Sequence, residues 1–381
     1  MQSQNITNMC CKILAVLFAL ASFADAEMCN SSICSLPDCL CASSRPPGDL
    51  EPQDIPQFVF LTFDDAVSVG NINYYREALT NRKNPDGCSI SATYFVTHEY
   101  TDYSKVHELW AQGHEIALHS ITHQTPTSHW QELSVEGHKR EFADQIDLIS
   151  KFANIPRSDI KGIRLPFLQL SGDNSFKMIQ ETDLKYDCSW PTQSYIKHGL
   201  FPYTLDYESS QDCSAGPCPN SSIPGVWVVP MVDWKDLKGA PCAMVDACSN
   251  IPSDEDDLLE FMKENFHRHY NGTRSPFGFY VHAAWFSKDI RNFHAYIGFL
   301  DYLQSLNDVY LVSIQQALEW VQDPKSLGNL GKSWTCNNNR TNVCGNGRSC
   351  KLQKESEERY MTICDSTCPR VYPWLGNPMG S

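Results

Sequence analysis

Basic residues are scarce in this sequence. It holds 30 lysines and arginines against 45 aspartates and glutamates, which gives a formal net charge of −15. Because lysine and arginine are the side chains that neutralise phosphates, this balance argues against a nucleic-acid ligand and against an anionic membrane surface. The 381 residues also lack a low-complexity tract and any repeat of a whole motif. A neutral or cationic ligand is compatible with this composition.

Hydrophobic runs long enough to cross a membrane are missing as well. The apolar run from Ile13 to Phe23 is shorter than the roughly 20 residues that a spanning helix needs. It follows Lys12 and precedes Ala24-Asp25-Ala26, which fits the small-residue rule for signal cleavage. We therefore predict a secretory signal over residues 1–26 and an extracellular chain without membrane association. An uncleaved anchor is the alternative.

The cysteine content fits export. Two of the 17 cysteines lie in the predicted signal, so 15 remain, mostly clustered over residues 29–41, 213–248 and 336–368. In an oxidising compartment such clusters form disulfides, and zinc bound by thiolates is the less common alternative. Because 15 is odd, one thiol is either free and buried or joined to another chain. Cys88 and Cys188 are isolated and are a candidate pair across the core. Export would also make four N-x-[ST] sites available for glycosylation, at Asn30, Asn220, Asn271 and Asn339.

Short apolar runs alternate with helical patterns from residue 58 onward. The expected strands are Phe58–Phe63, Ala92–Val96, Glu115–Leu118, Lys161–Leu165, Lys185–Cys188, Val226–Val229, Gly278–Val281 and Val309–Val312. The expected helices include Val135–Phe152, Asp257–Phe266 and Ile297–Leu306, whose apolar residues recur on one face. Such alternation predicts an α/β fold with a parallel sheet. Seven or eight units favour a distorted (β/α) barrel, with a doubly wound open sheet as the alternative.

Composition divides the chain into four segments. A Cys- and Pro-rich arm over residues 27–55 follows the predicted signal, and the alternating pattern occupies residues 56–330. Cysteines return in an extension over residues 331–381, which we expect disulfides to tie to the main domain. Residues 191–224 lack periodicity and read as an insertion at the barrel mouth, where long loops are tolerated.

Polar residues lie at the ends of several expected strands. They are Asp64 and Asp65 after the first strand, His119 after the third, Arg164 at the fourth, Asp233-Trp234 after the sixth and His282 after the seventh. In a parallel barrel all these ends open onto one face, where the chemistry of such folds takes place. Scattered core or surface residues would not fall at strand ends so consistently.

Two of these strand ends together predict a metal site. Asp64-Asp65 alone is usually a solvated turn, and a lone His119-x-x-x-His123 is more often a pair of surface histidines. Four-residue spacing on a helical turn would place both imidazoles on one face. One carboxylate and two imidazoles make three ligands with an open position, which is typical of catalytic metal sites. The second carboxylate is left to take a proton.

Five motifs resemble those of the NodB-homology polysaccharide deacetylases, carbohydrate esterase family four, in the order found in that family. They are Thr62-Phe63-Asp64-Asp65, His119-Ser-x-x-His123, Arg164-x-Pro166-Phe167, Asp233-Trp234 and the strand-end His282. Pro230-Met231-Val232, the segment Cys242 to Cys248, and His282-Ala-Ala-Trp285-Phe286 look more specifically like insect chitin deacetylases of the catalytic-domain-only group. The resemblance spans roughly residues 58–320. Tyr280, Leu165 and Phe167 depart from the residues that are common in the family.

The resemblance implies a secreted enzyme, associated with gut lumen or peritrophic matrix, that removes acetyl groups from N-acetylglucosamine units of chitin or its oligomers. It implies one divalent metal ion, expected to be zinc, with Asp65, His119 and His123 as its ligands. A monomer is expected. The implied roles of the other residues are Asp64 as general base, Arg164 as its partner, His282 as general acid, Asp233 as support for the imidazolium, the Phe167 amide as oxyanion donor and Trp234 as a wall of the sugar site.

Other readings remain open at this point. A deacetylase of the same fold could act on xylan or peptidoglycan, and a silent relative could bind chitin without cleaving it. A glycosidase using Asp64 and Asp65 is disfavoured, because adjacent residues hardly span the roughly 5–9 Å that such carboxyls require. Tyr195 or Tyr203 in the insertion could stack on a sugar, although core packing is the more common role of any one aromatic residue.

Overall fold

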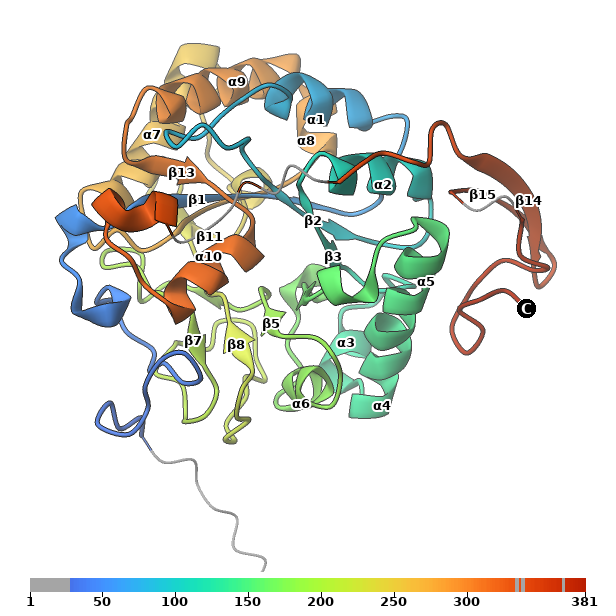
Figure 1. Cartoon of the computed structure of the whole chain (residues 1–381), viewed down its shortest axis with the longest axis horizontal. Coiled ribbons are helices and arrows are strands. Elements are labelled where there is room, and N and C mark those ends of the chain that lie inside the picture. Colours follow the sequence, from blue (N-terminus) through green and yellow to red (C-terminus); the bar gives the residue numbers. More distant parts are fainter. Residues whose placement is uncertain (1–27, 333–335, 337–339, 365–366) are drawn as a thin grey trace, which may run out of the picture.

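The computed structural model describes residues 28–332, 336, 340–364 and 367–381 (Figure 1). The predicted signal over residues 1–26 and the sequon Asn339 lie outside these residues. No helix within the described residues is both long and apolar enough to cross a membrane.

A curled sheet of nine strands forms the centre of the molecule (Figure 1). Its strands are β1 (Gln57–Asp64), β2 (Thr93–Val96), β3 (Glu115–Leu118), β4 (Gly162–Ile163), β5 (Tyr186–Asp187), β7 (Tyr203–Thr204), β8 (Trp227–Val228), β12 (Phe277–His282) and β13 (Val309–Leu311). The order is β12-β1-β2-β3-β4-β5-β8-β7, and β13 also pairs with β1. Every pairing is parallel except that of β7 with β8. The predicted distorted (β/α) barrel is confirmed.

Helices surround the sheet on its outer side (Figure 1). They are α1 (Ile72–Leu79), α2 (Tyr103–Ala111), α3 (Ser128–Glu132), α4 (Val135–His138), α5 (Asp144–Phe152), α6 (Asn174–Gln180), α7 (Glu255–Tyr270), α8 (Ala284–Lys288), α9 (Ile290–Gln304) and α10 (Ile314–Gln322). Local sequence explains their starts: the Asp254 side chain caps α7 by accepting from two backbone amides, and Ser313 begins α10 with a capping box. The helix expected over Val135–Phe152 is α4 and α5 joined by a π segment, η3 (Lys139–Ala143).

Strand β1 contributes side chains to two hydrophobic clusters, one inside the curled sheet and one between the sheet and the outer helices. All eight of its residues are buried, because both faces of the strand are covered. Phe58 and Phe60 belong to the cluster inside the curl, whereas Val59 and Leu61 pack against the outer helices. Side chains alternate along a strand, so Asp64 continues the inward-facing set. The strand pattern therefore aims this carboxylate at the barrel interior.

Seven disulfides lie within the described residues. They are Cys29–Cys41, Cys34–Cys39, Cys88–Cys336, Cys213–Cys218, Cys242–Cys248, Cys344–Cys364 and Cys350–Cys368. Disulfide formation is confirmed, but the suggested Cys88–Cys188 pair is wrong. Cys188 follows β5 in the inner cluster and is a buried free thiol, whereas Cys88 lies in the half-buried loop between α1 and β2.

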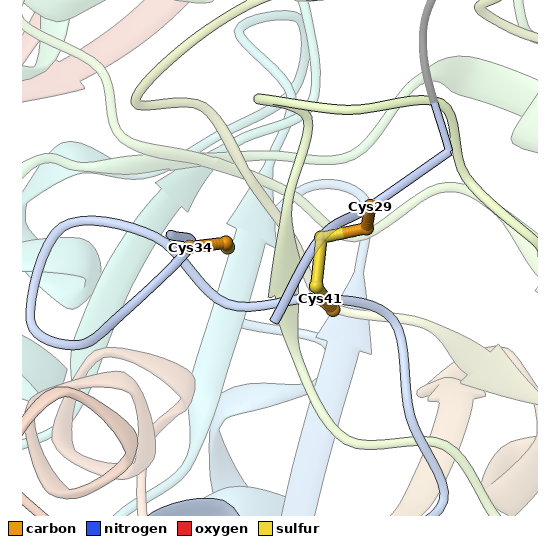
Figure 2. A group of neighbouring side chains, drawn as sticks. All are labelled: Cys29, Cys34 and Cys41. Atoms are coloured by element: carbon orange, nitrogen blue, oxygen red, sulfur yellow. A yellow bond between two sulfur atoms is a disulfide. The ribbon is translucent and has the colours of Figure 1, made fainter. Parts of the chain in front are cut away.

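The N-terminal arm is a small stapled segment. Three of its sulfur atoms, those of Cys29, Cys34 and Cys41, lie within 4.8 Å of one another, a spacing that is compatible with metal ligands. Figure 2 shows a sulfur–sulfur bond joining Cys29 to Cys41, and Cys34 is bonded to Cys39. The arm runs beside β7, where Leu40 O accepts a hydrogen bond of 2.9 Å from the Thr204 amide. These cysteines therefore form structural disulfides and are not metal ligands.

Short strand pairs complete the fold. They are β6 (Pro191–Thr192) with β9 (Met231–Val232), β10 (Trp234–Lys235) with β11 (Pro241–Cys242), and β14 (Arg348–Lys354) with β15 (Glu357–Ile363). The short helical turns are η1 (Pro47–Asp49), η2 (Pro52–Asp54), η4 (Arg157–Asp159), η5 (Pro166–Leu168), η6 (Val245–Ala247) and η7 (Leu327–Lys332). The β14–β15 hairpin lies against α2 through β15.

Candidate active site

Asp64 and Asp65 reach the same side of the barrel through a change in backbone conformation. Within a strand their side chains would point to opposite faces. Asp65 has φ of 80°, a left-handed conformation that few non-glycine residues adopt. The strand ends there, and the carboxylates of both residues lie near the same imidazole. Asp64 Oδ2 is 3.9 Å and Asp65 Oδ1 is 4.0 Å from His119 Nε2.

The two histidines converge through a loop and not through a helix. Residues Ser120 and His123 have φ of 77° and 45°, and the His123 amide donates to Ser120 Oγ. Glu141 fixes the outside of this loop, because its carboxylate accepts hydrogen bonds from the backbone of Ile121 and Thr122. The helical-turn explanation of the four-residue spacing is therefore wrong, although the two rings do meet, with centroids 5.0 Å apart.

Hydrogen bonding prepares His119 for metal binding. Its Nδ1 lies 2.7 Å from Arg164 O, a carbonyl that can only accept, so this nitrogen carries the proton and Nε2 presents a lone pair. Burial lowers the pKa of His119 to about 4, which keeps the ring in its neutral, metal-binding form. Ligand atoms of Asp65, His119 and His123 all lie within 4.8 Å of one another. Two imidazole nitrogens and one carboxylate oxygen fit a divalent ion such as zinc.

Asp64 is held by a buried arginine. Arg164 Nη1 lies 2.5 Å from Asp64 Oδ1, and both side chains are almost completely buried. Burial alone would raise the pKa of Asp64, but the Arg164 guanidinium, together with the charges of His119 and His282, more than offsets this and leaves the pKa below its ordinary value. Asp64 is therefore a carboxylate at neutral pH. It is fixed in place and ready to accept a proton.

A polar and aromatic cage fixes Arg164 in turn. Its Nε donates to Cys188 O at 2.8 Å, and its Nη2 lies 3.1 Å from Cys188 Sγ. The guanidinium also stacks 4.0 Å from the Phe95 ring centroid and 5.0 Å from that of Tyr280. Burial raises the pKa of the Cys188 thiol to about 12, so this sulfur stays protonated and neutral beside the cation. Each nitrogen of the Arg164 guanidinium therefore has a hydrogen-bond partner.

His282 lies at the end of β12, directly beside the end of β1 in register with Asp64. Its Nδ1 is 2.8 Å from Asp246 Oδ2, and its amide donates to the same oxygen at 3.1 Å. Burial alone would lower the pKa of His282, but the hydrogen bond to Asp246 and the charge of Asp64 raise it to about 9. His282 is therefore an imidazolium at neutral pH.

The carboxylate that supports His282 comes from a disulfide-closed loop. Asp246 lies in η6, between Cys242 and Cys248, which are bonded to each other. Asp233 had been expected in this position, and that expectation is wrong. Asp246 was missed because no spacing rule links it to His282, which is 36 residues away. Its position inside a short cystine loop, part of the insect-like segment, was the available signal.

Asp233 and Trp234 have surroundings other than the His282 ring, which is bonded to Asp246. Asp233 Oδ1 is buried without a hydrogen-bond partner among the described residues, and burial together with the charge of Asp212 raises its pKa to about 7. Trp234 is 2% exposed and donates to Gly278 O on the outer side of β12. It packs against the rings of Phe277 and Phe279. Trp234 belongs to the core and forms no wall of a sugar site, so that expectation is also wrong.

Phe167 closes one side of the metal site. Its ring is 45% exposed and lies 4.9 Å from the His123 ring. The turn of η5 uses the amides of Leu168 and Gln169, which donate to Leu165 O and Pro166 O. The Phe167 amide is outside these two bonds, and its φ of 60° sets its direction. In the insertion, Tyr203 is buried and bonded to Gln211, which removes it as a sugar contact.

The chain resembles known proteins over nearly its whole length. The polysaccharide deacetylase family profile matches residues 52–186. Chitin deacetylase 8 of Bombyx mori is 44% identical over 375 residues, covering 97% of this chain and 98% of that protein. Chitin deacetylase 1 of Bombyx mori is 39% identical over 376 residues, covering 93% of this chain and 69% of that protein.

The fold is also found among solved structures. A protein from Mycobacterium smegmatis assigned to the polysaccharide deacetylases superposes with a TM-score of 0.52 at 15% identity, covering 74% of this chain and 94% of that one. At this identity the likeness concerns the fold alone, whereas the two Bombyx mori proteins are 44% and 39% identical over alignments that cover 97% and 93% of this chain. The chain belongs to the polysaccharide deacetylase family.

Proposed function

We propose that this protein hydrolyses the N-acetyl groups of N-acetylglucosamine units in chitin or chitin oligomers, releasing acetate and leaving chitosan. The activity named for both Bombyx mori relatives supports this substrate. The observation that carries the proposal is the pair of oppositely tuned groups at neighbouring strand ends. Asp64 is kept ionised by Arg164, and His282 is kept protonated by Asp246, beside one group of metal ligands.

Asp65, His119 and His123 would hold one divalent metal ion, which we propose to be zinc because of the mixed nitrogen and oxygen donors. The chemistry that such an ion supplies when bound is Lewis-acid activation of water and of the acetyl carbonyl group. The remaining steps depend on side chains and amides of the protein itself.

Asp64 acts as the general base and takes a proton from the attacking water. Its carboxylate is available because the buried Arg164 keeps its pKa low and holds Oδ1, which leaves Oδ2 facing the imidazole of His119. As the water oxygen bonds to the acetyl carbon, negative charge develops on the carbonyl oxygen. The Phe167 amide lies outside the hydrogen bonds of its own turn and donates to this oxygen.

His282 acts as the general acid. Collapse of the tetrahedral intermediate breaks the bond between the acetyl carbon and nitrogen, and the nitrogen must gain a proton to leave as an amine. The imidazolium of His282 supplies this proton, and Asp246 orients the ring through Nδ1, so that Nε2 is the donating atom. The products are acetate and a glucosamine unit.

We further propose an extracellular location, in the gut lumen or peritrophic matrix, and a monomer that acts on this polysaccharide. Seven disulfides and the exposed sequon residues Asn30, Asn220 and Asn271 support an oxidising, secretory route. The proposed segments are a signal over 1–26, an arm over 27–55, the deacetylase domain over 56–330 and the extension over 331–381.

One assay separates this function from its rivals. Purified protein is incubated with chitin hexamer, and acetate and new reducing ends are measured with and without a chelator. We expect acetate release that the chelator abolishes and added zinc restores, without new reducing ends. Reducing ends without acetate would indicate a glycosidase, and neither product would indicate a silent binder. Faster release from acetylated xylan or peptidoglycan would reassign the polymer.

A further inference from the structure

Three exposed apolar side chains lie at the end of the barrel that carries Asp64 and Asp65. Within the described residues from 56 to 330, the large hydrophobic side chains that are exposed are Val69, Tyr100, Phe167, Leu237 and Ile290. Val69, Tyr100 and Phe167 lie in the connections that follow the carboxyl ends of β1, β2 and β4, whereas Leu237 lies between β10 and β11 and Ile290 begins α9. Exposed apolar residues grouped beside polar groups are typical of a ligand-binding site.

Tyr100 is carried by the loop between the two groups of metal ligands. This loop connects β2 to α2, and β2 pairs with β1 on one side and with β3 on the other. The Asp102 amide donates to Val67 O at 2.7 Å, just beyond Asp65. On the opposite side the His98 amide donates to Ser120 O at 3.3 Å, in the loop between the two histidine ligands. The loop that carries Tyr100 therefore lies between the connection that follows Asp65 and the one that follows His119.

The loop presents the Tyr100 ring to solvent in an unfavourable backbone conformation. Tyr100 is 73% exposed, and its φ of 67° lies in the left-handed region that bulky residues rarely adopt. The loop is closed beneath it by Thr101, whose hydroxyl donates to Thr97 O at 2.7 Å. Strained residues persist where the surroundings impose them, and they are concentrated at ligand sites.

The C-terminal extension supplies that surrounding structure. His98 is completely enclosed, with Nδ1 at 2.7 Å from the Tyr103 hydroxyl and Nε2 at 2.9 Å from Pro373 O. The Tyr372 ring lies 4.8 Å from the His98 ring. Glu99 pairs with Lys354 and Arg359 of the β14–β15 hairpin at 3.5 and 3.4 Å. The extension therefore contacts both residues that precede Tyr100, His98 and Glu99.

We propose that Tyr100 is a sugar-binding platform that packs against the pyranose face of an N-acetylglucosamine unit next to the unit being deacetylated. This inference rests on the proposed function and deepens it. A pyranose face is apolar and uncharged, and a rigid tyrosine ring offers it a large contact area at little entropic cost. Phe167 cannot replace it, because that ring packs on the ligand His123 and so borders the reacting unit itself.

The test compares Tyr100→Ala with Tyr360→Ala as a matched control. Tyr360 is 63% exposed on β15, in the C-terminal extension and outside the loop that carries Tyr100. For chitin hexamer we expect Tyr100→Ala to raise KM about three- to tenfold, the range for loss of one aromatic contact. The preference for hexamer over dimer should shrink with it. Tyr100→Trp should restore the KM, and Tyr360→Ala should match the unmodified protein.

Hexamer binding measured by calorimetry separates the two proposals. If the wild-type protein releases acetate and Tyr100→Ala has the same KM and the same length preference as the wild type, the platform is overturned. The proposed enzyme activity is then retained. If the wild-type protein releases no acetate but binds the hexamer, and Tyr100→Ala weakens this binding, the proposed deacetylase activity is overturned. The platform is then retained. Equal melting temperatures of the variants exclude unfolding as the cause.

Discussion

The two sides of the active site are built in different ways. The side that we propose to hold the base and the metal ligands comes from β1, β3 and the end of β4, which are separated only by β2 in the sheet. The acid side combines β12 with Asp246, which arrives on a loop closed by the Cys242–Cys248 disulfide. The first side depends on strand ends that any parallel barrel brings together. The second depends on one contact between a strand and an irregular connection.

The two sides also use opposite electrostatics. On the base side a cation, Arg164, keeps the Asp64 carboxylate ionised. On the acid side a carboxylate, Asp246, keeps the His282 imidazole protonated, with its pKa raised to about 9. When the pKa of one group is lowered and that of its neighbour is raised, the first can accept a proton and the second can donate one. Such pairs are typical of sites that use general acid–base catalysis. Substitutions on each side therefore test this contrast.

The largest effect is expected from removing a metal ligand. His119→Ala should abolish both bound metal and acetate release, because His119 contributes one of three ligand atoms that lie within 4.8 Å of one another. Metal content by elemental analysis and acetate release are the measurements. His294→Ala is the control, since that histidine is exposed on α9 and contacts Glu255. Full zinc content in His119→Ala would remove it from the ligand set.

Removing the base charge should have the next largest effect. Asp64→Asn should reduce kcat by about 10²–10⁴ while metal content stays near one ion, because general-base catalysis is lost. The change also leaves Arg164 buried without its carboxylate, so the free energy of unfolding should fall by about 3–5 kcal/mol. Metal content, kcat and chemical denaturation are measured together. Near-normal turnover would exclude Asp64 as the base.

Much of the base and metal side could be predicted from the sequence. The eight expected strands are present, and the motif residues at their ends fix Asp64, Asp65, His119 and Arg164 near one point. Parallel pairing is a strong constraint, because every strand end must open onto the same face. The reason given for the histidine spacing was still wrong, since left-handed residues in a loop, not a helical turn, bring the rings together.

The acid side could not be predicted to the same extent. The adjacent residues Asp233-Trp234 suggested a role, but Trp234 packs in the outer core and His282 is bonded to Asp246. The contact of Asp246 with His282 depends on the path of an irregular loop, which hydrophobic periodicity does not describe. The predicted disulfide between Cys88 and Cys188 was likewise wrong. The sequence around an isolated cysteine does not show whether its sulfur bonds to another cysteine or contacts a guanidinium, as Cys188 does.

A smaller effect separates Asp246 from Asp233. His282 donates its proton only while protonated, so activity falls as the pH rises through its pKa of about 9. Asp246→Asn removes the charge that raises this pKa, and the alkaline limb of the pH–rate profile should move to lower pH by roughly 1–3 units. Asp233→Asn should leave the limb in place. A shift in Asp233→Asn alone would restore the original assignment.

The smallest effect is expected from opening the loop that carries Asp246. Replacing both Cys242 and Cys248 by serine removes a bridge of sequence separation 6, and the free energy of unfolding should fall by about 2 kcal/mol. Replacing Cys34 and Cys39 in the arm removes a bridge of separation 5 and should cost about the same stability, because the closed loops are of similar length.

The two double variants should differ only in their pH–rate profiles. Without its bridge the η6 turn can drift from His282, so a fraction of molecules lose the 2.8 Å contact and the alkaline limb should move down by less than in Asp246→Asn. The arm variant should keep the wild-type limb, since its bridge lies far from β12 in the sequence and packs beside β7. If both variants keep that limb, β12 and the packing of η6 suffice to hold Asp246. The acid side would then be as firmly built as the base side, and the contrast between them would be one of sequence pattern alone.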